Sequence, residues 1–314
     1  MIVQKIDSNK IIEYIKTIAI LGNIDHYDDI NVGSGGAQLF IVVDRKGDRY
    51  VIKNSGLNKD SSLLKEYKFY EINRKNKFSF VPETIHTEIH SEYGVIIVMK
   101  MYKHIKYDEW DHNLQLKAVD LCAMINSIDK NYFFDLDLKQ NLITLNEDFL
   151  LRSYKDWIFV INQHNVIHGE KIIDEIYKNL DIVCPILNNG NQYICHGDFH
   201  PENILIDNED FIICDWQNVK IGKGIGDVSF FVDRAHGFGI HVDSEKIIDN
   251  YCLCLSKYIG KTIDKKNILQ EQSAAALKNI FSYWAEYLKD CSWEKVYPLY
   301  QKMVNAYKLL IYVK

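Results

Sequence analysis

The spacing of hydrophobic and polar positions changes about a third of the way along the chain. Residues 30–54 and 82–101 consist of short apolar runs that alternate with polar positions and end at glycine or other turn residues, a pattern typical of strands. Residues 61–76, between them, have helical spacing without glycine or proline. Residues 11–18 place isoleucines on one face of an amphipathic helix. The first part is therefore predicted to be a mostly β unit with one main helix inside it and another in front.

Beyond the first hundred residues the apolar period is helical over much longer segments. The change near residue 101 predicts two units, an N-terminal lobe of residues 1–101 and a C-terminal lobe of residues 102–314, and an α+β fold. The helices are predicted at residues 107–129, 147–165, 170–188, 243–258, 265–290 and 293–312.

One strand-like stretch interrupts the helical part. The letters "ILIDNEDFIICD" alternate like a hairpin with its polar tip at residues 207–210, which we interpret as a solvated turn. If Ile206 pairs with Phe211, Asn203 lies opposite Cys214, one residue before Asp215. An amide oxygen and a carboxylate then meet at the open end of the ribbon, and these are ligands that suit Mg²⁺.

A third polar residue precedes this pair. Asp198 lies five residues before Asn203, in the loop that leads into the hairpin. A carboxylate that orients an attacking hydroxyl beside a cation is the arrangement that phosphoryl transfer requires. His196 and His200 are four residues apart, which is compatible with zinc, but Pro201 and the lack of a third-ligand motif disfavour that alternative.

The string "HGDFHPEN", followed by "CDW", resembles the signatures of the aminoglycoside phosphotransferase and choline kinase-like enzymes, distant relatives of protein kinases. This resemblance implies a two-lobed protein-kinase-like fold with a small antiparallel β lobe and a larger helical lobe. It also implies that Asp198 is the catalytic base, that Asn203 and Asp215 bind Mg²⁺, and that ATP, or GTP, donates the phosphate. His196 is implied to be structural, within the catalytic loop.

The same resemblance directs attention to the nucleotide end. "YVIK" resembles a kinase strand element, which makes Lys53 the candidate for the α- and β-phosphates. The backbone from Met99 to Met101 is expected to meet the adenine. A loop between two strand-like runs is expected to cover the phosphates, although it does not match G-x-G-x-x-G; its residues are Gly33, Ser34, Gly35 and Gly36.

A glutamate is expected to hold the lysine in place. Glu66 and Glu71 flank opposite sides of the apolar arc of the helix at 61–76, so periodicity does not choose between them. The family's pattern, here "EYKFY", favours Glu66. Further along, the resemblance implies that Asp227 braces the catalytic loop, and its position before an apolar run suggests a helix N-cap.

Composition limits the choice of partner and compartment. With 47% apolar residues and four prolines the chain is typical of a globular protein, and the net charge of -6 argues against a nucleic-acid partner. No signal peptide or membrane span is expected, and the seven cysteines have no disulfide-like spacing. We therefore expect a cytoplasmic protein with reduced thiols and no membrane partner.

The acceptor is the least determined part. Acids and aromatic residues mix at "YDEWDH" and after Tyr283, a combination that binds cations or stacks on sugars. At helical spacing Trp284, Tyr287 and Cys291 are more often core. The sequence thus predicts a kinase for a small, hydroxylated and possibly cationic acceptor such as an aminoglycoside. A choline, sugar or other metabolite kinase and a non-catalytic nucleotide-binding scaffold remain alternatives, and the oligomeric state is left open.

Overall fold

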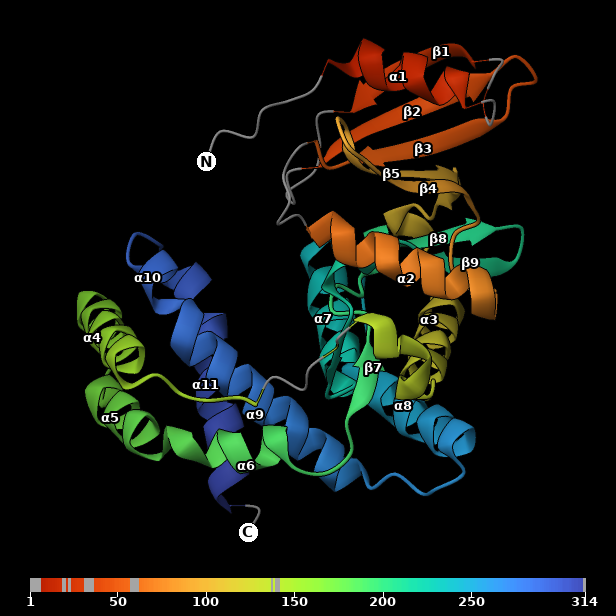
Figure 1. Ribbon diagram of the computed structural model, residues 1–314. Coiled ribbons are helices and arrows are strands. Elements are labelled where there is room, and N and C mark those ends of the chain that lie inside the picture. Colours follow the sequence, from red (N-terminus) through yellow and green to blue (C-terminus); the bar gives the residue numbers. More distant parts are fainter. Residues whose placement is uncertain are drawn as a thin grey trace.

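A five-stranded antiparallel sheet with strand order β1-β2-β3-β5-β4 forms the first part of the molecule (Figure 1). The computed structural model describes residues 7–18, 21, 24–30, 37–56, 62–136, 138 and 142–312. Successive side chains of a strand point to opposite faces of the sheet, and both faces of the interior strand β5 are buried. The elements of this part are α1 (Ser8–Thr17), β1 (Ile24–Ile30), β2 (Gln38–Asp44), β3 (Arg49–Asn54), α2 (Ser62–Asn76), β4 (Thr84–His90) and β5 (Gly94–Lys100).

The two helices pack on opposite faces of this sheet. Ile11 and Ile15 of α1 share an apolar cluster with Ile96 and Val98 of β5, while Ile97, between those two, belongs to the core that contains α2. The alternation along one strand therefore connects α1 to one face and α2 to the other.

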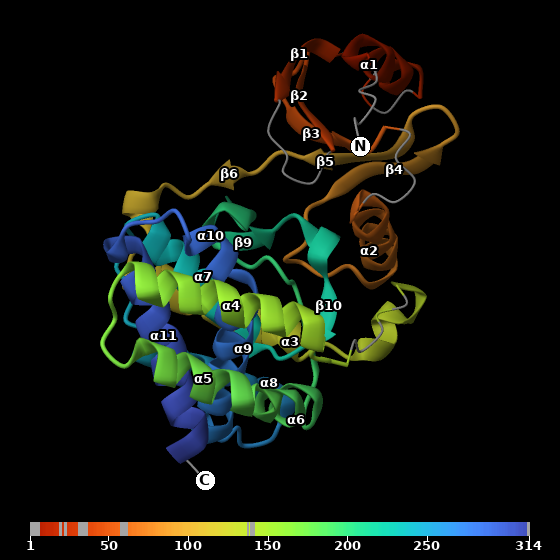
Figure 2. The ribbon, with the colours of Figure 1, turned by 90° about the vertical axis from the view of Figure 1, so that its left-hand side faces the viewer.

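Helices make up most of the remaining chain. Their apolar residues form two clusters, one continuous with α2 and one formed by α4, α5, α6, α9, α10 and α11, which lie together on one side of the molecule (Figures 1 and 2). No helix in the described ranges is long and apolar enough to cross a membrane. The helices are α3 (His112–Asn126), α4 (Glu147–Gln163), α5 (Gly169–Asn179), α6 (Val183–Asn188), α7 (Ile225–Gly237), α8 (Ser244–Ile259), α9 (Lys265–Tyr283), α10 (Ala285–Leu288) and α11 (Trp293–Tyr312).

The predicted hairpin is present with the predicted register. Strands β8 (Ile204–Asp207) and β9 (Asp210–Ile213) pair Ile206 with Phe211, and the Cys214 amide donates to the Asn203 carbonyl oxygen at 3.0 Å. β8 also pairs with β6 (Lys103–His104), which follows the sheet directly. A second ribbon pairs β7 (Tyr193–Cys195) with β10 (Lys220–Gly222), so the loop between β7 and β8 is anchored at both ends.

Aromatic rings join α2 to the segment after β9. The indole of Trp216 stacks on Phe69 of α2 with centroids 4.0 Å apart, and Phe69 stacks in turn on Phe133 at 5.7 Å. All three rings are buried, and the Trp216 indole N–H donates to the Ile213 carbonyl oxygen at 2.7 Å. The ring stack, as we call Trp216, Phe69 and Phe133, fixes the helix against the ribbon.

The α+β class and the β-rich first part are as predicted, but β1 ends at residue 30, where the first strand was expected to begin, and several helical boundaries differ. The segment 107–129 begins with a 3-10 turn, and α3 starts only after Asp111, whose carboxylate accepts from the Leu114 amide. The segments 170–188 and 265–290 are each broken, the second at Trp284. Helix α7 was absent from the predicted helix segments and was indicated only by the expected N-cap at Asp227. Trp284 and Tyr287 are 40% and 64% exposed, so assigning them to the core was wrong.

Candidate active site

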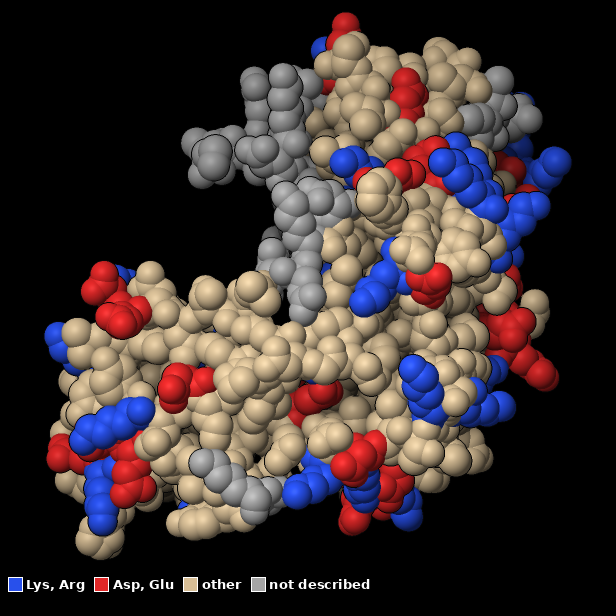
Figure 3. Space-filling view, turned by 60° about the horizontal axis from the view of Figure 1, so that its bottom comes forward, with Lys and Arg blue, Asp and Glu red and all other residues tan. Residues whose placement is uncertain are grey.

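A cleft of about 590 Å³ lies between the sheet and the β8–β9 ribbon. Side chains of β2, β3 and β5, among them Leu39, Val51 and Met99, line it from the sheet. Asp198 and Asp215 line it from the loops around the ribbon. The face in Figure 3 is hollowed beside the sheet, and its acidic and basic side chains are interspersed. The cleft therefore has an apolar region and a strongly polar region.

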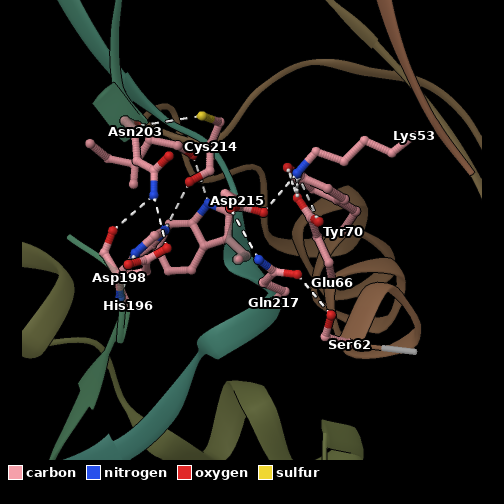
Figure 4. A network of polar contacts seen from close by, with 12 residues as sticks. Lys53, Ser62, Glu66, Tyr70, His196, Asp198, Asn203, Cys214, Asp215 and Gln217 are labelled. Carbon is pink, nitrogen blue, oxygen red and sulfur yellow. Dashed lines mark hydrogen bonds and ion pairs between the residues drawn. The ribbon is translucent and has the colours of Figure 1, made fainter. Parts of the chain in front are cut away.

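Lys53 is the cation at the polar end. Its ammonium group donates to both carboxylate oxygens of Glu66, at 2.9 and 3.0 Å, and to Asp215 Oδ1 at 2.9 Å (Figure 4). Burial alone would lower the pKa of Lys53, but the charges of Glu66 and Asp215 outweigh it and raise that pKa above its ordinary value. The lysine is therefore permanently charged and held at a fixed position.

The structure distinguishes between the two glutamates of α2. Glu66 is fully buried and also accepts from the Tyr70 hydroxyl at 3.0 Å. Glu71 faces the other way, where it contacts Arg74 and Thr87. Glu66 is thus the partner of Lys53, the choice that the family pattern favoured and periodicity left open.

Asp215 is oriented by its backbone and by two neighbours. Its φ of 67° turns the chain sharply after β9. Asp215 Oδ2 accepts from the Gln217 amide at 3.2 Å, and Gln217 accepts from the Ser62 hydroxyl at 2.8 Å (Figure 4). The sequence reading missed Gln217, although a polar residue two positions after the "CD" pair was a signal that could have pointed to it.

Asn203 and Asp198 form the other half of the polar end. The Asn203 amide group donates to the Asp198 carbonyl oxygen at 2.9 Å and reaches Asp198 Oδ2 at 3.4 Å. This leaves the amide oxygen of Asn203 without a hydrogen-bond donor among the described residues. Burial raises the pKa of Asp198, while the hydrogen bond from Asn203 and the charge of Arg234 oppose that shift.

The loop that carries Asp198 is braced from beneath. Asp227 of α7 accepts from the amides of His196 and Gly197, at 2.7 and 2.9 Å. Asp227 lies in the first turn of α7, which begins at Ile225, so the N-cap prediction was wrong: its carboxylate serves the loop rather than its own helix. Gly197 has φ 83°, and a Cβ there would lie 2.2 Å from the Asn218 carbonyl oxygen.

His196 is also part of this brace. Its Nε2 lies 2.9 Å from the Cys214 carbonyl oxygen, and its Nδ1 lies 3.3 Å from the Asp198 amide. Burial lowers the pKa of His196 to about 4, so the ring is neutral, with Nε2 donating and Nδ1 accepting. Both ring nitrogens are engaged within the loop, which contradicts the zinc alternative.

Beyond Asp198 the cleft is bordered by a group of charged and aromatic side chains. Glu202 accepts from the Tyr107 hydroxyl and from Arg234, each at 3.0 Å. The Arg234 guanidinium lies 4.8 Å above the Phe238 ring, which stacks on Tyr107 at 4.5 Å. The sequence reading singled out none of Glu202, Arg234 and Phe238, because nothing in their spacing marks them.

The remaining predicted residues are those expected to contact the purine and the phosphates of a nucleotide. Met99 and Met101 both line the cleft, and the Met101 amide donates to the Arg49 carbonyl oxygen at 2.9 Å, so this N–H is already satisfied. The expected phosphate loop, Gly33, Ser34, Gly35 and Gly36, lies outside the described residues.

Comparisons with known proteins agree with this architecture. A sequence model described as the phosphotransferase enzyme family matches residues 30–248. A search of curated proteins found no match. Among solved structures, the AMP-bound complex of spectinomycin phosphotransferase has a TM-score of 0.61 at 13% identity and covers 98% of this chain and 99% of its own.

Two further structures are similar over nearly their whole length. A GDP complex of a mutant aminoglycoside 2'-phosphotransferase-IIIa has a TM-score of 0.60 at 13% identity, covering 97% of this chain and 100% of its own. Choline kinase from Cryptosporidium parvum Iowa II has a TM-score of 0.59 at 12% identity, covering 97% and 96%. These likenesses confirm the two-lobed protein-kinase-like fold.

Proposed function

The chain belongs to the phosphotransferase enzyme family, and from this premise we propose that it is a kinase that transfers the γ-phosphate of ATP, or GTP, to a hydroxyl group of a small molecule. The observation that carries the proposal is the convergence of Lys53, Asp198, Asn203 and Asp215 on one cleft. We further propose that the lobes meet between residues 101 and 102, where β5 gives way to the connection through β6.

The nucleotide occupies the cleft with its base toward the sheet. Leu39, Val51 and Met99 offer an apolar surface for a purine ring, and the backbone from Met99 to Met101 lies at its edge. Lys53 then lies at the level of the α- and β-phosphates, and a phosphate-covering role for Gly33, Ser34, Gly35 and Gly36 stays a prediction. The similar structures named above include AMP and GDP complexes, which supports a nucleotide co-substrate.

Asn203 and Asp215 are the residues that would hold Mg²⁺. Their amide and carboxylate oxygens are hard ligands of the type this ion takes, and the hydrogen bonds from Asn203 to Asp198 leave its amide oxygen available. A bound Mg²⁺ would neutralise charge on the phosphate oxygens. Because Lys53 contacts Asp215 at 2.9 Å, this carboxylate is already positioned before any ligand binds.

Asp198 acts on the acceptor. Its carboxylate accepts the proton of the acceptor hydroxyl while the hydroxyl oxygen bonds to phosphorus and the bond to the leaving nucleoside diphosphate breaks. Asn203 and the loop beneath hold this carboxylate in place. Most of the rate enhancement comes from positioning and electrostatics, because the transition state is loose.

The acceptor is a small hydroxylated compound that enters beside Glu202. We propose an aminoglycoside first, because the carboxylates of Glu202 and Asp198, which both line the cleft, suit a cationic molecule, with choline or a sugar as the alternative. Two of the similar structures are antibiotic phosphotransferases and one is a choline kinase. The seven free cysteines support a cytoplasmic location.

The test compares Asp198→Ala with the wild-type enzyme. Phosphate transfer from Mg²⁺-ATP to candidate acceptors is measured by release of ADP, and ATP binding by calorimetry. We expect turnover to fall at least about 100-fold while the affinity for ATP changes little. A variant that keeps full turnover would refute the assignment of the base. Nucleotide-dependent capture of a partner without any Asp198-dependent product would instead favour a non-catalytic scaffold.

A further inference from the structure

The imidazole of His200 is buried in the cleft wall, and none of the described residues forms a hydrogen bond with its Nδ1. Its side chain is only 10% exposed. Nδ1 lies 3.6 Å from Glu202 Oε2 and Nε2 lies 3.8 Å from Asp198 Oδ1, both too long for a hydrogen bond. Polar groups of a ring this buried normally have hydrogen-bond partners, so the gap between Nε2 and Asp198 calls for an explanation in a native protein.

The surroundings keep these gaps open. Glu202 is held by Tyr107 and Arg234, so its carboxylate is not free to close on the ring. Asp198 is held on its other side by Asn203. The His200 ring packs edge-on against Phe230, with centroids 5.7 Å apart. The spacing between His200 and the two carboxylates is therefore set by the fold.

In either neutral tautomer, one ring nitrogen of His200 faces a carboxylate without a proton between them. Burial lowers the pKa of His200. A neutral imidazole has one donor and one acceptor nitrogen. Whichever nitrogen lacks the proton, its lone pair faces a carboxylate. A hydroxyl group completes the Asp198 side, because it accepts from Nε2–H and donates to the carboxylate.

The distance fits such a bridge. With 3.8 Å between Nε2 and Oδ1, one oxygen atom fits at about 2.9 Å from the nitrogen and about 2.7 Å from the carboxylate oxygen. The lone pair that this oxygen does not use remains available for attack on phosphorus. The protein thus offers a two-point site for a single hydroxyl oxygen.

We propose that His200 is a catalytic residue that binds the reacting oxygen of the acceptor: Nε2–H donates to the acceptor hydroxyl while that hydroxyl donates its proton to Asp198. The inference rests on the proposed function and adds a second contact to the same oxygen. During transfer the oxygen–phosphorus bond forms, the bond to the leaving nucleoside diphosphate breaks and the proton moves to Asp198. His200 neither gains nor loses a proton.

The experiment uses three variants of the full chain and Mg²⁺-ATP with water as the acceptor. His200→Gln carries an amide N–H about as far from the backbone as Nε2, His200→Asn carries one at the level of Nδ1, and His200→Ala carries none. Phosphate release gives kcat and the KM for ATP, calorimetry gives the affinity for Mg²⁺-ADP, and thermal unfolding reports on the fold.

We expect His200→Ala and His200→Asn to lower kcat about 10- to 100-fold with little change in nucleotide affinity or in unfolding temperature. His200→Gln should recover most of the loss. Equal kcat for His200→Ala and wild type, or a Gln variant no better than the Ala variant, would overturn the inference while leaving the proposed function intact. If Asp198→Ala hydrolysed ATP as fast as wild type, the proposed function would fail and the inference with it.

Discussion

Replacing Glu66 tests whether the buried ion pair organises the nucleotide end of the cleft. Lys53 makes three short contacts, two of them to Glu66, and its side chain is only 12% exposed. Removing one partner of a buried pair costs about 3–5 kcal/mol because the other charge stays buried. The remaining contact to Asp215 reduces this cost, while the Tyr70 hydroxyl loses its acceptor, worth about 1–3 kcal/mol.

These contributions lead us to expect a loss of about 4 kcal/mol in the free energy of unfolding for Glu66→Ala. Glu66→Gln keeps an oxygen for Lys53 or Tyr70 but loses the charge, so its cost should be about half as large. Glu71→Ala is the matched control on the same helix. Its ion pair with Arg74 is partly exposed on both sides, so it should cost about 1 kcal/mol or less.

Urea unfolding followed by circular dichroism measures all three variants, with the m-value required to stay unchanged. The KM for ATP should rise for the Glu66 variants, because Lys53 is then free to settle on Asp215 alone. A Glu66→Ala protein within about 1 kcal/mol of wild type, or a Glu71→Ala protein that loses as much, would refute the reasoning.

Two other predictions concern the loop that carries Asp198. Gly197→Ala combines a φ of 83° with a Cβ placed 2.2 Å from a carbonyl oxygen, so it should cost more than about 2 kcal/mol in unfolding free energy and reduce kcat. Gly47→Ala, with φ 87° and nothing within 4 Å, should cost only about 1 kcal/mol, and equal losses in chemical denaturation would contradict the clash. Burial lowers the pKa of His196 from 6.5 to about 4. Between these pH values the histidine is protonated in the unfolded chain but neutral in the folded chain. The free energy of unfolding therefore decreases by about 3 kcal/mol as pH falls from 6.5 to 4. Burial raises the pKa of Asp227 from 3.8 to about 6, so a similar contribution is present below pH 3.8 and lost as pH rises through 6. The two trends oppose each other, and each variant removes one of them. Denaturation between pH 4 and 6 should therefore show that the free energy of unfolding rises with pH in Asp227→Asn and falls with pH in His196→Asn. Identical pH slopes in both variants would contradict this prediction.

Local patterns in the sequence predicted the parts of the site that depend on local geometry. A hairpin of period two has one register that fits its turn, so the pairing of Ile206 with Phe211 and the meeting of Asn203 with Cys214 followed from the letters alone. The choice of Glu66 did not, because both glutamates border the same apolar arc and only the position of the sheet decides which one is buried.

Contacts between segments that are distant in the chain could not be predicted from the sequence. Asp227 supports amides 31 and 30 residues away, and no local signal distinguishes this role from capping its own helix. The start of α7 was predicted too late, at Asp227, because Gly224 and Gly226 are typical of a loop. Trp284 has the spacing of a core residue, but the break between α9 and α10 leaves it exposed. Helical periodicity alone does not show whether an apolar side chain near the end of a helix is buried by a neighbouring element.

The ring stack has a consequence for control of the enzyme. An outward swing of α2, which would separate Lys53 from Glu66, would also pull Phe69 off Trp216 and bring both rings into water. Exposing these two rings to water costs about 2 kcal/mol each, and breaking the ion pair of Lys53 and Glu66 adds to this cost. Fewer than about one molecule in a thousand would therefore have α2 in the outward conformation at equilibrium. The ion pair of Lys53 and Glu66 is therefore formed as soon as the chain has folded, and no separate activation event has to move this helix into place. We therefore expect the activity of the protein in a cell to depend on how much of it is synthesised and on the supply of its substrates.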